Sequence, residues 1–264
     1  MSKGDPKNYV LRVDRNVYDQ RQASRIWHKH LVNTLNTKLK FKQSAHDECV
    51  FYRGTTIYLL YTDDSMLAGP DEHEIELIIN EIKASELDIT VLGNLKDFLG
   101  VNISRTDDGR VHVSQPQLIK QIIDTTFQSK AIPRPTPAKA TEILRRHERL
   151  PSHDYEFNYR SIIGKLNHLE RGTRSDISYV TRQCARLCID PKRPHVEAVR
   201  WLVRCLIGTS KMGYFINPKY TKGLEICVDA GFSGNWDPSA PEKERDTARS
   251  RHGHVIMYLG APIV

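Results

Sequence analysis

The sequence predicts an α+β fold, in which hairpins of short β-rich runs alternate with amphipathic helices. Its 264 residues are 39% hydrophobic and 27% charged, an ordinary globular composition that excludes disorder, collagen and coiled coil. This length suffices for one large or two modest domains with real cores. No apolar run approaches the ~20 residues needed to span a bilayer, so we expect no membrane partner.

The first third of the chain is expected to form a sheet with two helices. Apolar residues at helical spacing predict helices over 22–39 and 71–84, the second with acidic residues in its first turns. β-rich runs predict strands at 9–14, 49–52, 56–61 and 66–68. The tetrapeptide Tyr61-Thr62-Asp63-Asp64 separates the last two runs, which gives the pattern strand, acidic turn, strand.

The rest of the chain predicts a second group of elements. Four prolines between 129 and 154 interrupt the periodicity and indicate a loop-rich linker. The helices expected around this linker are 116–126, 156–171, 176–189 and 193–209. The strands expected are 97–104, 110–114, 212–216, 224–229 and 254–259, with a turn at 107–109 and a loop at 231–250.

Charge and cysteine usage indicate the kinds of ligand and the cellular compartment to expect. The net charge is +7, and an acidic block at 43–128 lies between basic blocks at 1–42 and 129–211. Acidic residues attract metal ions and basic residues attract phosphate, although any solvated surface shows such drift. The five cysteines form no CxxC pair and no secretory signal is visible. We therefore expect an intracellular protein, cytoplasmic or nuclear, without a disulfide or zinc framework.

The acidic turn at Tyr61-Thr62-Asp63-Asp64 is the sharpest chemical feature. Two adjacent carboxylates repel each other unless cations are present. Two Mg²⁺ ions about 4 Å apart are the usual solution for nucleotidyl transfer, in which one activates a 3′-hydroxyl and the other steadies pyrophosphate. The alternative is a plain polar turn, since aspartate is common in turns. The placement between two apolar strands favours the metal site.

Eight segments in order along the chain resemble the Pol polyprotein of copia-type long-terminal-repeat retrotransposons, in its reverse transcriptase region running into the start of ribonuclease H. They are Val17–Trp27, Cys49–Tyr52, Leu95–Val101, Val113–Gln115, Tyr159–Leu166, Thr173–Tyr179, Ala198–Thr209 and Val228–Phe232. The resemblance implies a partial polymerase palm at 1–93, then a primer-grip hairpin, thumb and linker at 94–150. A helical thumb or connection at 151–211 and truncated ribonuclease H-like strands at 212–264 would follow.

The resemblance also implies roles for individual residues. Asp63 and Asp64 would be catalytic ligands of Mg²⁺, or of Mn²⁺ in its place, with Tyr61 bracing the turn. Asp229 would be the first metal ligand of the ribonuclease H site. The residues expected near template–primer or dNTP are Arg21, Gln22, Phe98, Leu99 and Gly100. Independently of the family, Arg200 and Arg204 could follow a nucleic-acid backbone or form a solvated helix face. Other Pol fragments are further expected partners.

Departures from the family pattern limit the expected activity. The third palm carboxylate is expected upstream of Tyr18, before this sequence begins, and further ribonuclease H carboxylates are expected after 264. Asp19 stands where the family has glycine, which adds bulk and negative charge near nucleotide phosphates. We therefore expect an RNA-directed DNA polymerase by ancestry that is inactive as this isolated chain. The alternatives are a non-catalytic nucleic-acid-binding relic and a poorly folded relic.

Overall fold

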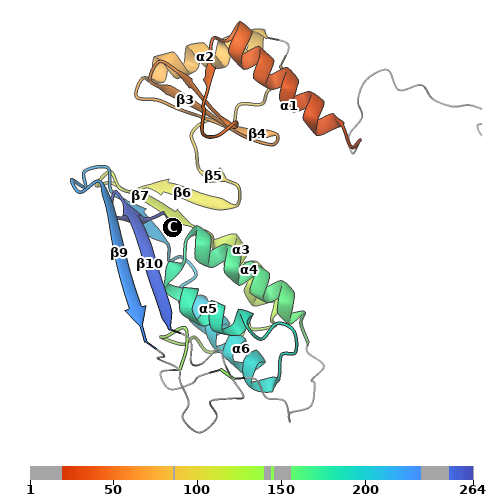
Figure 1. Ribbon diagram of the computed structural model, residues 1–264, viewed down its shortest axis with the longest axis vertical. Coiled ribbons are helices and arrows are strands. Elements are labelled where there is room, and N and C mark those ends of the chain that lie inside the picture. Colours follow the sequence, from red (N-terminus) through yellow and green to blue (C-terminus); the bar gives the residue numbers. More distant parts are fainter. Residues whose placement is uncertain (1–19, 86, 140–143, 146–155, 233–249, 264) are drawn as a thin grey trace, which may run out of the picture. The chain divides into compact units, whose positions relative to one another are not determined.

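The computed structural model describes residues 20–85, 87–139, 144–145, 156–232 and 250–263. The chain divides into two compact units, Met1–Leu92 and Gly93–Val264, each of which is described by itself (Figure 1). The strand expected at 9–14, Asp19 and most of the loop expected at 231–250 lie outside the described residues.

The first unit is a four-stranded antiparallel sheet with helices. Its strands follow chain order: β1 (Lys42–Gln43), β2 (Val50–Arg53), β3 (Thr56–Tyr61) and β4 (Asp64–Ala68). Helix α1 (Ala23–Asn33) continues into the π-helical turn η2 (Thr34–Lys38), and α2 (Glu72–Ala84) follows the sheet. The side chain of Asp71 caps α2 by accepting a hydrogen bond from the backbone N–H of His73 at 2.9 Å. The expected strands and helices of 22–84 are thus confirmed.

Alternation along β3 decides which face of this sheet is covered. Thr56, Tyr58 and Leu60 are buried, whereas the residues between them are more exposed. The buried face packs against both helices, and the fully or nearly fully buried side chains of this core are Leu31, Leu35, Leu39, Phe41, Phe51, Tyr58, Leu60, Ile78, Ile82 and Leu87. The opposite face of the sheet carries no part of this core.

Arg53 links the sheet to both helical segments. Its guanidinium forms a two-point ion pair with Glu81 of α2, in which Nη2 donates to Oε1 at 3.1 Å and Nη1 donates to Oε2. Nη1 also donates to the carbonyl of Leu39, just after η2, at 3.1 Å. This pair raises the pKa of Arg53 and lowers the pKa of Glu81, mainly through the side-chain hydrogen bond. The end of β2 is therefore fixed against α2.

The second unit contains two antiparallel sheets. One has the order β5 (Asp97–Phe98), β6 (Val101–Arg105), β7 (Val111–Ser114) and β8 (Tyr214–Ile216). The other has the order β11 (Ala261–Pro262), β10 (Arg251–Tyr258) and β9 (Leu224–Gly231). The backbone N–H of Asn217 donates to the carbonyl of Leu259 at 2.9 Å, so the end of β8 meets the turn between β10 and β11.

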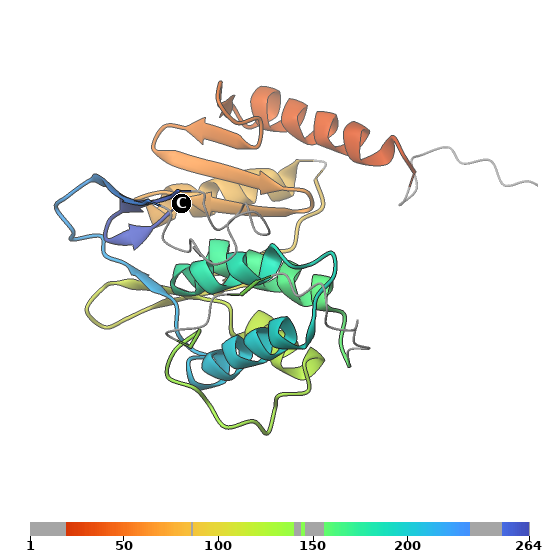
Figure 2. The same ribbon diagram turned by 60° about the horizontal axis from the view of Figure 1, so that its bottom comes forward.

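Among the described residues of the second unit, four helices share one apolar core (Figures 1 and 2). They are α3 (Pro116–Thr125), α4 (Tyr159–Gly172), α5 (Ser178–Ala185) and α6 (Arg193–Gly208), with the 3₁₀ turn η3 (Ser175–Ile177) before α5. Helix α3 contacts α4 and α6, and α5 contacts the same two helices. Their apolar faces meet in one cluster, in which Ile162, Leu166, Val199, Leu202 and Leu206 are fully buried. The four expected helices are thus confirmed, but the one expected at 176–189 is shorter and ends at Ala185.

The proline-rich segment packs on the outer face of α6. Trp201 donates from Nε1 to the carbonyl of Thr136 at 3.0 Å, and the guanidinium carbon of Arg134 lies 4.5 Å from the centre of its ring. Arg204 donates from Nε to the carbonyl of Ile132 at 2.7 Å. Residues 132–136 are thus fastened to the helix, although they have no helix or strand of their own.

Two observations refine the sequence-based expectations. The strand expected at 97–104 is two strands, because residues 99 and 100 form a tight turn. The strand at 214–216, which we grouped with the ribonuclease H-like segment, pairs with β7 instead. All five cysteines are free thiols. Among the described residues, no helix is long and apolar enough to cross a membrane.

Candidate functional site

The acidic turn lies at the tip of the β3–β4 hairpin, as the sequence predicts. Tyr61 pairs with Asp64, so Thr62 and Asp63 are the two turn residues. Thr62 has φ of 54°, whereas Asp63 has no positive φ, which is the φ pattern of a type II′ turn. Glycine usually fills the first position of that turn, because a β-branched residue is strained at positive φ. The turn therefore holds a local strain at the candidate site.

Both carboxylates of the turn belong to exposed residues. Tyr61, Asp63 and Asp64 are all exposed, and Tyr61 keeps 57% of its surface accessible. Exposed carboxylate oxygens are the donors that Mg²⁺ and Mn²⁺ prefer, and Mg²⁺ keeps several waters when protein supplies only one or two carboxylates. Within the described residues, no group of three or more His, Cys, Asp or Glu side chains converges. The donor chemistry fits a divalent cation, and two acids of this turn can supply it.

The sheet face opposite the helices leads to this turn. By register, Tyr52 lies beside Ile57, Leu59 beside Met66, and Tyr61 beside Asp64, all on the face opposite the helices. Ile57, Leu59 and Met66 are half-buried, whereas Tyr52 is 44% exposed. Sequence reasoning missed this apolar surface, which the alternation along residues 56–61 could have revealed. Asp64 therefore stands at the end of an apolar, partly aromatic platform.

The residues predicted to hold the primer, Phe98, Leu99 and Gly100, lie in the hairpin formed by β5 and β6. Phe98 pairs with Val101, and Leu99 and Gly100 form the turn with φ of 52° and 76°. Two positive φ values indicate a type I′ turn, which suits the twist of paired strands. Phe98 is half-buried and Leu99 is 43% exposed. The hairpin thus presents an apolar side chain at its tip from a strained backbone.

The remaining predicted residues are dispersed. Arg21 and Gln22 are exposed at the start of α1. Asp229 is an exposed residue of β9, opposite Gly253 of β10. Among the described residues, Asp229 is not part of any group of three acidic, His or Cys side chains that could hold a metal ion. Its metal-binding role stays a prediction.

The two arginines of α6 already have partners within the protein. Arg200 donates from Nη1 to Glu197 and from Nη2 to Glu156, each at 3.0 Å. Arg204 is bonded to the carbonyl of Ile132. Both arginines therefore have hydrogen-bond partners within the second unit. Binding of nucleic acid by these two residues stays a prediction.

Comparison with known proteins identifies the family to which this chain belongs. The family model described as reverse transcriptase (RNA-dependent DNA polymerase) matches residues 2–140, which is more than half of the chain. The chain therefore belongs to the reverse transcriptase family. More narrowly, it corresponds to the reverse transcriptase region of copia-type retrotransposon Pol polyproteins, as the sequence resemblance predicted.

The relatives cover nearly all of the chain. The retrovirus-related Pol polyprotein from transposon RE1 of Arabidopsis thaliana is 29% identical over 260 residues, which are 97% of this chain and 17% of that protein. The putative transposon Ty5-1 protein of Saccharomyces cerevisiae is 26% identical over 262 residues, which are 97% of this chain and 80% of the relative. This chain thus spans less than a fifth of the RE1 polyprotein. No solved structure gives a significant match.

Proposed function

We propose that the β3–β4 turn is the metal-binding part of an RNA-directed DNA polymerase site. Asp63 and Asp64 would hold Mg²⁺ or Mn²⁺, and Tyr61 would brace the turn beside the primer end. When bound, the metal would supply charge stabilisation for nucleotidyl transfer. The carrying observation is that a chain of the reverse transcriptase family presents two exposed, adjacent carboxylates on a hairpin whose strands fix their backbone.

The two other surfaces extend this proposal to the template–primer. The apolar platform of Tyr52, Ile57 and Met66 leads to Asp64 and offers aromatic and aliphatic surface to a nucleic acid. The Phe98–Gly100 hairpin would hold the primer strand, and Arg21 and Gln22 would lie near template or dNTP. The net charge of +7 favours association with phosphate backbones. Other Pol fragments are further proposed partners, and Asp229 is proposed as a ligand in a ribonuclease H-like site.

A second function is non-catalytic binding of nucleic acid. The observation that favours it is that no third acidic side chain joins Asp63 and Asp64 among the described residues. Two-metal sites clamp both the attacking and the leaving oxygen, and a pair of acids alone is a sparse ligand set for that task. The positive charge and the apolar platform would still support binding without chemistry.

Primer extension with Mg²⁺ or Mn²⁺ separates these functions. We expect Asp63→Asn to abolish any extension by the purified chain, because it removes an anionic ligand from the turn. Asp88→Asn is the matched control, since Asp88 is an exposed acid of the same unit, and it should leave extension unchanged. Extension that survives in Asp63→Asn would refute the polymerase assignment. Binding without extension, with affinity that falls steeply as salt rises, would support the second function.

A further inference from the structure

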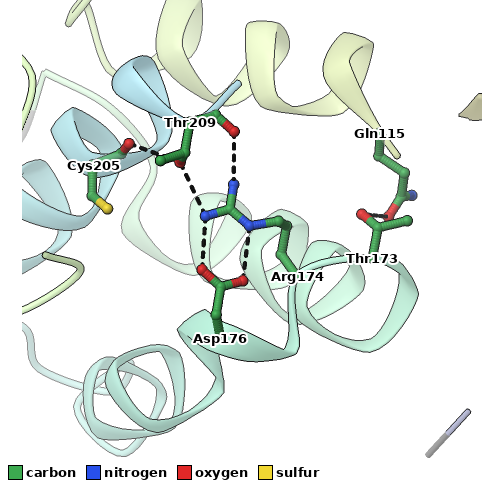
Figure 3. A network of polar contacts seen from close by, with 6 residues as sticks. All are labelled: Gln115, Thr173, Arg174, Asp176, Cys205 and Thr209. Atoms are coloured by element: carbon green, nitrogen blue, oxygen red, sulfur yellow. Dashed lines mark hydrogen bonds and ion pairs between the residues drawn. The ribbon is translucent and has the colours of Figure 1, made fainter. Parts of the chain in front are cut away.

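The residues that follow helix α4 contact two segments that join the β5–β6–β7–β8 sheet to the helices. One segment leaves the sheet after β7, and the other leads from α6 into β8. Thr173 donates from Oγ1 to Oε1 of Gln115 at 3.1 Å, and Gln115 directly follows β7. The next residue, Arg174, bonds to Thr209, the C-cap residue of α6. Figure 3 shows both contacts side by side. Two neighbouring residues thus reach partners that are 58 and 35 positions away in the chain.

Arg174 is held in one orientation by this arrangement. Only 1% of the residue is exposed, and its Nε and Nη2 each donate to the carboxylate of Asp176 at 2.8 Å. Nη1 donates to the carbonyl of Thr209 at 3.1 Å, and Nη2 donates to Oγ1 of Thr209 at 3.0 Å. A planar guanidinium can make this two-sided set of bonds, whereas a lysine ammonium cannot.

Thr209 is connected to the sheet through the short turn that follows it. Its hydroxyl donates to the carbonyl of Cys205 at 2.9 Å, and its carbonyl accepts from the backbone N–H of Met212 at 2.9 Å. The tight turn at 209–212 leads to Gly213 and β8, which pairs with β7. The strand order then continues from β7 through β6 to β5, where the Phe98–Gly100 hairpin lies.

From this connectivity we propose that Arg174 is a positioning residue. It sets the position of the β5–β6–β7–β8 sheet on the bundle formed by helices α3 to α6. Through the sheet it sets the place of the Phe98–Gly100 hairpin. The bundle has its own apolar core from α3 to α6, so it does not need Arg174 to bring its helices together. The role in placing the hairpin for a primer rests on the proposed function, whereas the coupling of sheet and bundle does not.

Fluorine NMR of protein labelled with 4-fluorophenylalanine tests the coupling. The chain has seven phenylalanines, of which Phe215 reports on β8, Phe98 on β5 and Phe157 on the bundle core. Arg174→Lys keeps the positive charge but removes the planar guanidinium that bonds to both Asp176 and Thr209. Thr209→Val is the milder variant, because it removes only the hydroxyl and keeps the carbonyl acceptor. Arg171→Lys, at an exposed residue of α4, is the matched control.

We expect the Phe215 and Phe98 resonances to shift or broaden in both test variants, while the Phe157 resonance stays in place. The control should leave all three unchanged. The coupling is overturned if Phe215 is unchanged in Thr209→Val and Arg174→Lys, or if Phe157 changes together with Phe215 in Thr209→Val. Affinity for a primer–template should fall in the test variants and not in the control. If the wild-type chain binds no primer–template, the proposed function fails, and the fluorine spectra still decide the coupling.

Discussion

Gly213 gives the most quantitative prediction, because an added methyl group there has no room. A Cβ on Gly213 would lie 1.9 Å from the carbonyl oxygen of Val113 and 3.0 Å from Cβ of Ser114. The first distance is roughly 1.5 Å shorter than ordinary carbon contacts. The obstructing atom is backbone of β7, so it cannot rotate away like a side chain. Gly213→Ala must therefore push β8 away from β7.

The expected cost combines two effects. Overpacking a well-packed site costs roughly 1–3 kcal/mol, and each weakened hydrogen bond between β7 and β8 costs about 1 kcal/mol. We therefore expect Gly213→Ala to destabilise the second unit by roughly 3 kcal/mol. For a unit of this size, 1 kcal/mol shifts Tm by about 2–4 °C, so its Tm should fall by roughly 6–12 °C.

Gly164→Ala is the matched control for this change. Gly164 is an exposed residue inside α4, and a Cβ there meets nothing within 4 Å. Alanine is the better helix former, so this variant should gain about 0.5–1 kcal/mol. Differential scanning calorimetry resolves the transitions of the two units. The packing explanation is refuted if Gly213→Ala melts within about a degree of wild type, or if the two variants shift Tm in the same direction.

Two further predictions concern the first unit. Glu81→Gln should destabilise it at pH 7 by up to about 1 kcal/mol, since the ion pair with Arg53 is partly exposed. Because Arg53 lowers the pKa of Glu81, this stabilisation is present above the ordinary pKa of 4.5 and is lost as pH falls below it. Urea unfolding should therefore show a gap between wild type and variant at pH 7 that closes towards pH 3, and a constant gap would contradict this reasoning. Thr62→Gly should stabilise the unit by about 0.5–1 kcal/mol, since it relieves strain at φ of 54° but adds backbone entropy to the unfolded chain. A lower Tm in this variant would show that Thr62 is not strained.

Features that depend on neighbouring residues are the ones that the sequence predicts well. The β3–β4 hairpin and its acidic turn form within 13 consecutive residues, so β-rich runs around two acids were sufficient to place them. Helix α2 likewise has its cap at Asp71 and its apolar stripe within one segment. The turn at Leu99 was missed within 97–104, because leucine is rare at positive φ and only Gly100 signals the reversal.

Features that depend on distant partners were not predictable from one sequence. The segment Thr173–Tyr179 was recognisable as a family motif, but nothing in it indicates that Arg174 is buried against Thr209. Helical periodicity placed Arg200 and Arg204 opposite the apolar face of α6. It could not show that Ile132 and Thr136 of the proline-rich segment would contact that helix. Long-range contacts of this kind depend on how elements pack, which local spacing does not determine.

The difference between local and long-range contacts also explains why the hairpin can present two acids while the set of metal ligands around them stays small. A two-residue turn is enough to present Asp63 and Asp64, because the hydrogen-bonded pair Tyr61 and Asp64 fixes both ends of it. The family resemblance places a further metal ligand on another strand, so its position would depend on the packing around the hairpin tip. Metal affinity and primer extension consequently test different parts of the candidate site. Binding of Mn²⁺ that is lost in Asp63→Asn needs only the turn, whereas extension needs the turn and a correctly packed further ligand.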